Sequence, residues 1–147
     1  MSQSREIGSV PDVVRYWAAH SPEQIALISD TRMISYGSLS QSSNRLANSM
    51  IGAEIRAGGH VGYLGMNSDT FFDVWFGAGK IGCAFAPFNW RLAPAELVEI
   101  IDDAEPSIIF VEAGFREKME AIQAGTSARY EVVYFDRNLT EGGLQDW

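Results

Sequence analysis

The sequence predicts an α/β fold in which a parallel sheet is built from βαβ units and a small hairpin precedes it. Short apolar runs alternate with helical patterns from residue 61 onward, and two strand-like runs lie close together nearer the N-terminus. Alternation of this kind is typical of parallel strands joined by crossover helices. The chain has 147 residues, of which 46% are hydrophobic, so it can bury a core and is not a disordered chain.

Composition and charge exclude several functions. The net charge is -8, and the 11 basic residues are scattered along the chain, so nucleic acid is not an expected partner. One cysteine, Cys83, cannot form an internal disulfide. No uncharged run approaches the roughly 18 to 20 residues that span a bilayer, and no apolar leader follows the polar first residues. We therefore expect a cytoplasmic protein without a transmembrane segment.

The first predicted helix covers residues 9–20. Ser9 is a suitable N-cap and Pro11 suits the first helical turn. The apolar side chains of this segment that share one face are Val13, Val14, Trp17 and Ala18. Ser21-Pro22 then ends the helix, because the residue before a proline disfavours helical backbone.

A hairpin and a long helix follow. Residues 25–29 and 32–35 flank Asp30-Thr31, which predicts two short strands joined by a tight turn. Between residues 36 and 51 the apolar positions repeat with a helical period, while the other face carries Ser, Gln, Asn and Arg. The apolar stripe consists of Leu39, Leu46, Ala47, Met50 and Ile51. This pattern predicts a surface helix.

Strands and helices alternate from there on. Residues 60–65 read as a buried strand after Gly58-Gly59, and Asn67-Ser68-Asp69 begins a helix. Four aromatic residues of this helix lie on one stripe, at Phe71, Phe72, Trp75 and Phe76. Each can bury on the order of 150 to 250 Å², so we expect this helix to be the most heavily packed.

The remaining elements continue the alternation up to Asp136, where the pattern fades. They are a strand at 83–88, a helix at 94–104, a strand at 107–111, a helix at 115–125 and a strand at 130–135. Pro94 suits the first turn of its helix and Pro106 ends it. We find no linker or internal repeat, so the chain is expected to form one unit.

Gly77, Gly79 and Gly82 match the G-x-G-x-x-G spacing of dinucleotide-binding folds. That chemistry needs glycines in a turn between a strand and the start of a helix, whereas these glycines end a helical pattern. We interpret the first two as sites of close helix packing and the third as a helix terminator. The alternative, a dinucleotide site, rests on spacing alone. Lys80 and Lys118 are the only lysines, and neither completes a Walker-type phosphate loop.

No residue of the chain is predicted to be catalytic or to bind a metal. His20 and His60 are forty residues apart, without a nucleophile or carboxylate at motif spacing. Cys83 lies in an apolar run and is interpreted as a buried, unreactive thiol. The acidic pair Asp102-Asp103 lies on a predicted helix, where we expect a solvated surface rather than convergent metal ligands.

Arg91 is the one candidate binding residue. It follows Asn89 in a loop after the predicted strand 83–88, at the carboxyl end where open α/β sheets bind ligands. Its guanidinium could pair with a phosphate or carboxylate through two parallel hydrogen bonds. The alternative is an ordinary surface arginine.

Several segments together resemble the N-terminal portion of the acyl-CoA synthetases, the AMP-dependent acid:CoA ligases of the adenylate-forming superfamily. The segments that carry the likeness are Ser21–Leu27, Ile34–Leu39, Ser43–Ala47, Gly59–Val61, Asn67-Ser68, Trp75–Gly82, Pro87–Leu92 and Ala95–Leu97. Three positions depart from the usual family pattern, namely Ser38, His60 and Ala93. The last two affect turns and caps and put local stability in doubt more than function.

The resemblance implies that residues 1–147 form the N-terminal segment of an AMP-binding large domain. The full-length enzyme would activate a fatty or aryl carboxylic acid with ATP and magnesium and then transfer the acyl group to CoA. The family's phosphate loop and C-terminal domain would lie beyond Trp147, so we expect this chain to be inactive alone and to bind no cofactor tightly. The arginine of Asn-x-Arg-Leu implies a role for Arg91 in binding a CoA phosphate. The alternative function is a stand-alone interaction module that self-associates through an exposed sheet edge.

Overall fold

The computed structural model describes residues 7–29 and 32–136 of the chain. Their elements, in chain order, are α1 (Val10–His20), β1 (Ile25–Ile28), β2 (Met33–Ser35), α2 (Tyr36–Gly52), β3 (His60–Leu64), α3 (Asp69–Lys80), β4 (Ala84–Phe88), α4 (Pro94–Ala104), β5 (Ile108–Glu112), a 3-10 turn (Ala113–Phe115), α5 (Arg116–Gly125) and β6 (Glu131–Phe135). No helix in this described part is long and apolar enough to cross a membrane.

The four strands from β3 onward form a parallel sheet in the order β4-β3-β5-β6. This confirms the predicted βαβ architecture. The separate hairpin pairs β1 with β2 in antiparallel register, with Ile25 opposite Ser35 and Ile28 opposite Met33. Its predicted turn, Asp30-Thr31, lies outside the described residues.

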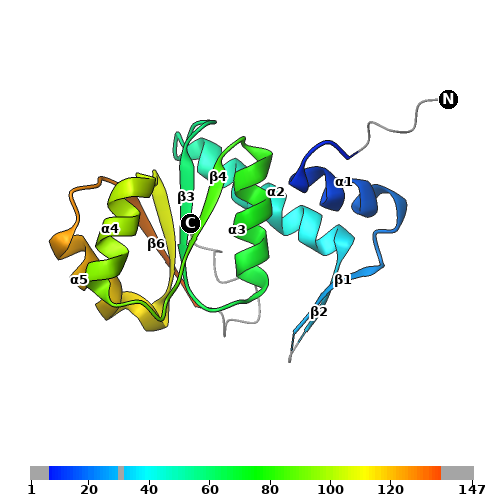
Figure 1. The fold of residues 1–147 in the computed structure, drawn as a ribbon. Coiled ribbons are helices and arrows are strands. Elements are labelled where there is room, and N and C mark those ends of the chain that lie inside the picture. Colours follow the sequence, from blue (N-terminus) through cyan, green and yellow to red (C-terminus); the bar gives the residue numbers. More distant parts are fainter. Residues whose placement is uncertain (1–6, 30–31, 137–147) are drawn as a thin grey trace.

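Helices cover both faces of the sheet (Figure 1). Helices α2 and α3, with α1 packed outside them, lie on one side, and α4 and α5 lie on the other. A fully buried layer of Val61, Tyr63, Ile108 and Phe110 faces the first group. Leu64, Ile109 and Val111 face the second group. Strands buried on both faces are typical of parallel sheets, because the crossover helices enclose them.

Helices α2 and α3 begin where a serine side chain satisfies one of the first free N–H groups. The Ser35 hydroxyl accepts from the Ser38 N–H at 3.2 Å at the start of α2. The Ser68 hydroxyl accepts from the Phe71 N–H at 3.4 Å at the start of α3. These contacts explain why short polar residues in the sequence mark the element boundaries.

The four rings of the predicted aromatic stripe on α3 differ in burial. Phe76 is buried, but the other three rings are only half-buried, at Phe71, Phe72 and Trp75. The fully buried side chains of α3 in the core against the sheet are Val74 and Ala78. These small residues bring the helix close to the sheet, and the larger rings lie to the side, where Phe71 and Trp75 contact Phe85 of β4.

The glycines near the end of α3 have the packing roles expected from the sequence. A Cβ on Gly79 would lie 2.6 Å from Pro11 Cγ, so α1 and α3 need a glycine where they meet. A Cβ on Gly77 would lie 3.3 Å from the Ser43 carbonyl oxygen of α2. Gly82 follows the helix with a φ of 75°, which favours glycine. The G-x-G-x-x-G spacing therefore belongs to a helix end, and not to a dinucleotide-binding turn.

Candidate functional site

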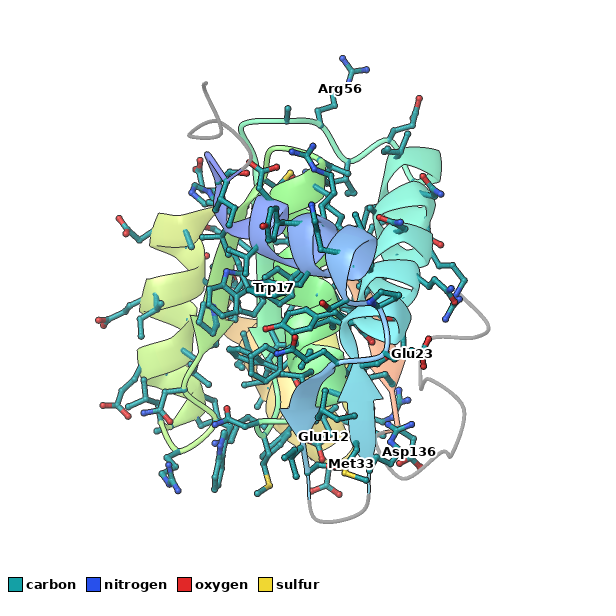
Figure 2. All side chains as sticks on the ribbon, turned by 90° about the vertical axis from the view of Figure 1, so that its right-hand side faces the viewer. Trp17, Glu23, Met33, Arg56, Glu112 and Asp136 are labelled. Carbon is teal, nitrogen blue, oxygen red and sulfur yellow. The ribbon has the colours of Figure 1, made fainter. Side chains whose placement is uncertain are left out.

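The carboxyl ends of the parallel strands gather at one end of the molecule. Figure 2 shows Glu112, at the end of β5, and Asp136, which follows β6, at the end opposite Arg56. The loops after β3 and β4 leave the sheet at this carboxyl edge, because both strands run parallel to β5. Open α/β sheets bind their ligands at such an edge.

A cleft of about 540 Å³ lies between the loops that follow β3 and β4. It is lined by Tyr63, Gly65, Met66, Asn67, Phe71, Pro87, Phe88, Asn89, Trp90 and Arg91. Aromatic surface and one guanidinium therefore face the same space. This combination suits an organic ligand that carries a negatively charged group.

Two side chains from the sheet hold the loop after β3. The buried Glu112 carboxylate accepts a hydrogen bond from the Met66 N–H at 2.8 Å. The Tyr63 hydroxyl donates to the Met66 carbonyl oxygen at 2.8 Å. A Cβ on Gly65 would lie 3.0 Å from Glu112 Cβ, so a larger residue there would push the two strands' loops apart. One wall of the cleft is thus fixed by the sheet itself.

Arg91 lies on the opposite wall, in the loop predicted from the sequence. Its N–H donates to the Asn89 Oδ1 at 3.0 Å, and the Leu92 N–H donates to the Asn89 carbonyl oxygen at 3.0 Å. These two bonds close a tight turn. The exposed Arg91 side chain lies over the Trp90 ring, with its guanidinium carbon 4.4 Å from the ring centroid. No carboxylate among the described residues forms an ion pair with it.

Lys118 of α5 supports the same loop from beneath. Its Nζ donates to the Trp90 carbonyl oxygen at 2.6 Å and to the Leu92 carbonyl oxygen at 2.7 Å. The Trp90 ring also packs on Phe115, with centroids 5.6 Å apart. The sequence analysis missed Lys118, because a lysine among acidic and basic neighbours in a helix looks like a solvent-exposed residue. Nothing in its local pattern indicates a partner 28 residues away.

The other titratable residues considered from the sequence lie apart from this cleft. His20 Nδ1 is 2.8 Å from the Tyr16 carbonyl oxygen at the end of α1, and His60 begins β3 at the amino edge. Cys83 is buried, its thiol donates to the Arg56 carbonyl oxygen at 3.1 Å, and burial raises its pKa. The structure therefore confirms that the Cys83 thiol is buried.

The acidic surface of α4 differs from the prediction. Asp102 is not simply solvated, since its Oδ1 accepts from the Thr126 hydroxyl and from the Ser127 and Ala128 N–H groups. These bonds lower its pKa. Within residues 7–29 and 32–136, no three His, Cys, Asp or Glu side chains gather into a group that could hold a metal ion.

A separate polar cluster joins α2 to α3. Lys80 Nζ donates to the Ser40 carbonyl oxygen at 3.2 Å, to the Ser43 hydroxyl at 2.7 Å and to Asn44 Oδ1 at 2.8 Å. Burial raises the pKa of the Asp73 carboxyl to about 6, although the Ser42 hydroxyl donates to it and acts in the opposite direction. These groups bind to one another, and they do not line the cleft that contains Arg91.

Comparison with known families decides the relationship. Residues 14–146 match the family described as AMP-binding enzyme. The chain belongs to this family. Its fold also agrees with the inhibitor-bound N-terminal domain of FACL13 from Mycobacterium tuberculosis, with a TM-score of 0.82 over 89% of this chain and 34% of that chain, at 24% sequence identity. The AMP-binding fold is therefore shared, and the described cleft lies within it.

Two curated relatives of this AMP-binding chain are acid ligases. The chain is 29% identical over 119 residues to the fatty acid–acyl-carrier-protein ligase ScoC of Streptomyces coeruleorubidus, covering 81% of this chain and 23% of that protein. It is 32% identical over 119 residues to the indoleacetate–CoA ligase of Aromatoleum aromaticum, again 81% of this chain and 23% of the relative. The chain thus spans about a quarter of the length of the curated relatives that it matches.

Proposed function

We propose that this chain is the N-terminal part of an AMP-forming acid:CoA ligase and that Arg91 binds a phosphate of CoA. The observation that carries the proposal is the exposed guanidinium of Arg91 at the rim of a 540 Å³ cleft on the carboxyl edge of the sheet. Family membership supplies the reaction class, and the names of the relatives, a fatty-acid ligase and an indoleacetate–CoA ligase, support a carboxylic acid substrate.

The proposed reaction has two steps. A carboxylate attacks the α-phosphorus of ATP, giving an acyl-adenylate and releasing pyrophosphate. The thiol of CoA then attacks the acyl carbon and releases AMP. AMP is a far better leaving group than the oxygen of the free carboxylate. Magnesium would offset phosphate charge in the full-length enzyme, and we assign no ligand for it in this chain.

Within that reaction, the described residues bind and orient CoA. A guanidinium can donate two parallel hydrogen bonds to a phosphate, and the aromatic surface beside Arg91 offers contact area for the rest of the ligand. The single cysteine, Cys83, is free and buried, which suits the cytoplasmic location that we propose.

The substitution Arg91→Ala tests this role. We expect CoA affinity, measured by NMR titration of the 147-residue chain at millimolar CoA, to fall roughly tenfold, since a charge-assisted contact of about 1.4 kcal/mol is lost. Pantetheine, which lacks every phosphate of CoA, should bind both forms equally. Arg129→Ala is the matched control, because Arg129 is also exposed but precedes β6 at the amino edge. An unchanged CoA affinity in Arg91→Ala would contradict the proposal.

A second candidate function is a stand-alone interaction module that pairs through a sheet edge. It is favoured by β6, which among the described residues pairs with β5 on one side only. Such an edge can accept an added strand, and β6 contains no proline to prevent this. Size-exclusion chromatography over a range of concentrations separates the two functions. A monomer at every concentration would count against the module.

A further inference from the structure

The loop that carries Arg91 is shaped by side chains from α4, α5 and the loop itself. Asn89 closes the turn, and Glu96 of α4 accepts from the Ala93 N–H at 2.8 Å at the far end of the loop. Between these points, the carbonyl groups of Trp90 and Leu92 both accept from Lys118. The two residues bonded to Lys118 are therefore the direct neighbours of Arg91 in the chain.

This arrangement leads us to propose that Lys118 is a positioning residue, which orients the Arg91 loop so that the guanidinium faces a phosphate-bearing ligand in the cleft. The proposal rests on the phosphate-binding role proposed above for Arg91. One ammonium bridges the Trp90 and Leu92 carbonyl oxygens, at 2.6 and 2.7 Å, and so holds the peptide unit directly before Arg91 and the one directly after Leu92.

The ring of Trp90 also restricts the position of the Arg91 guanidinium. It contacts both Phe115, with ring centroids 5.6 Å apart, and the Arg91 guanidinium, whose carbon lies 4.4 Å from the ring centroid. An arginine held on an aromatic face loses less conformational freedom when it binds an anion than one that moves freely in water. Lys118 and Phe115 belong to adjoining parts of the chain, so α5 and the turn before it support both the backbone and the ring of this loop.

Removing the ammonium while keeping the length of the side chain tests the proposal. In Lys118→Met, we expect hydrogen exchange of the Arg91 and Leu92 amides to accelerate by roughly tenfold or more, because the turn loses two charge-assisted bonds. CoA affinity, measured by NMR titration, should fall roughly tenfold while pantetheine affinity stays the same. If Lys118 had a merely structural role, its loss would lower the affinity for both CoA and pantetheine, or for neither.

Two further variants make the result specific. Arg116→Gln is the matched control, since it removes one positive charge from α5 where the guanidinium lies over the Tyr134 ring, 3.7 Å from its centroid. We expect it to leave amide exchange in the Arg91 loop and the ratio of CoA to pantetheine affinity unchanged. Lys118→Gln, which keeps a polar head group without charge, serves if the methionine variant does not fold, and the same selective loss is expected.

The outcomes separate this proposal from the one on which it rests. If Arg91→Ala weakens CoA binding but the Lys118 variants do not, the positioning role is wrong and the role of Arg91 stands. If Arg91→Ala has no effect on CoA binding, the phosphate-binding role fails, and the positioning role falls with it. Faster amide exchange without any change in CoA affinity would also overturn the positioning role, since the loop would then be ordered for stability alone.

Discussion

Asp73 couples the protonation of one carboxyl to the packing of α2 on α3. Its side chain accepts from the Ser42 hydroxyl, and Arg45, Arg32 and Lys80 contribute favourable charge. Burial outweighs these contributions and raises its pKa from 3.8 to about 6. Between pH 3.8 and about 6, the Asp73 carboxyl is therefore more often protonated in the folded state than in the unfolded chain.

Because of Asp73, the free energy of unfolding should consequently fall as the pH rises from about 4 to about 6. Above pH 6, the full cost of burying the ionised carboxylate should remain. Asp73→Asn removes this penalty while an amide oxygen can still accept from Ser42. We expect the difference in the free energy of unfolding between the variant and the original chain to be up to about 3 kcal/mol more favourable to the variant at pH 7.5 than at pH 4. Urea denaturation at both pH values measures the difference.

Asp102 provides the control of opposite sign. The Thr126 hydroxyl and two backbone N–H groups lower its pKa below 3.8, so its stabilising contribution is present above that value and is lost as the pH falls through the folded pKa. Asp102→Asn should destabilise the chain at neutral pH and less so in acid. If Asp73→Asn showed the same trend as Asp102→Asn, the assigned effect of burial would be wrong.

At the scale of secondary-structure elements, the contact between α1 and α3 depends on the absence of a side chain at one position. A Cβ on Gly79 would lie 2.6 Å from Pro11 Cγ, and the rigid proline ring at the start of α1 cannot move away by rotation of a flexible side chain. By contrast, a Cβ on Gly52, the last residue of α2, would meet nothing within 4 Å.

We therefore expect Gly79→Ala to destabilise the chain by about 1 to 3 kcal/mol, even though alanine is the better helix former. Gly52→Ala carries the same change in helix propensity without the clash and should be neutral or stabilising by up to about 1 kcal/mol. Thermal unfolding followed by circular dichroism compares the two. Equal effects of the two substitutions would show that helix propensity, rather than the α1–α3 contact, decides the result.

At the scale of the whole molecule, the described cleft brings together aromatic surface and a guanidinium that can bind a ligand. The sequence lacks a Gly-rich phosphate loop with Ser or Thr, and neither of its two lysines lies in one. The Arg91 wall and the Glu112 wall are built from loops and strands of a single sheet. These described segments thus form two walls of one cleft.

We accordingly expect the 147-residue chain by itself to form no acyl-CoA from ATP, CoA and a panel of fatty and aryl acids. Without donors placed around the transferring phosphoryl group, the charge that develops in the adenylation step is not stabilised. Release of pyrophosphate and formation of the thioester, each followed by mass spectrometry, test this. Sustained turnover with any acid in the panel would contradict it.

Much of the fold could be predicted because its signals are local. Asn67-Ser68-Asp69 marks a helix start, and the alternation of apolar runs with helical patterns predicted the parallel sheet. The burial of each individual ring of α3 could not be predicted, because hydrophobicity says how much a side chain gains from burial, and not which face of a helix a neighbour can approach. Val74 and Ala78 face the sheet because they are small enough to allow close packing, although the rings beside them are more hydrophobic.

The sequence by itself determined the family, the order of strands and helices and the position of Arg91 in a loop after β4, because each depends on residues that are neighbours in the chain. Only the tertiary structure decided which residues meet across the sheet. Lys118 contacts the Arg91 loop, and Glu112 contacts Met66 46 residues away, through hydrogen bonds between distant segments. Such pairs exist only after the crossover helices have brought the strand ends to one edge, since no local pattern encodes a partner so far along the chain.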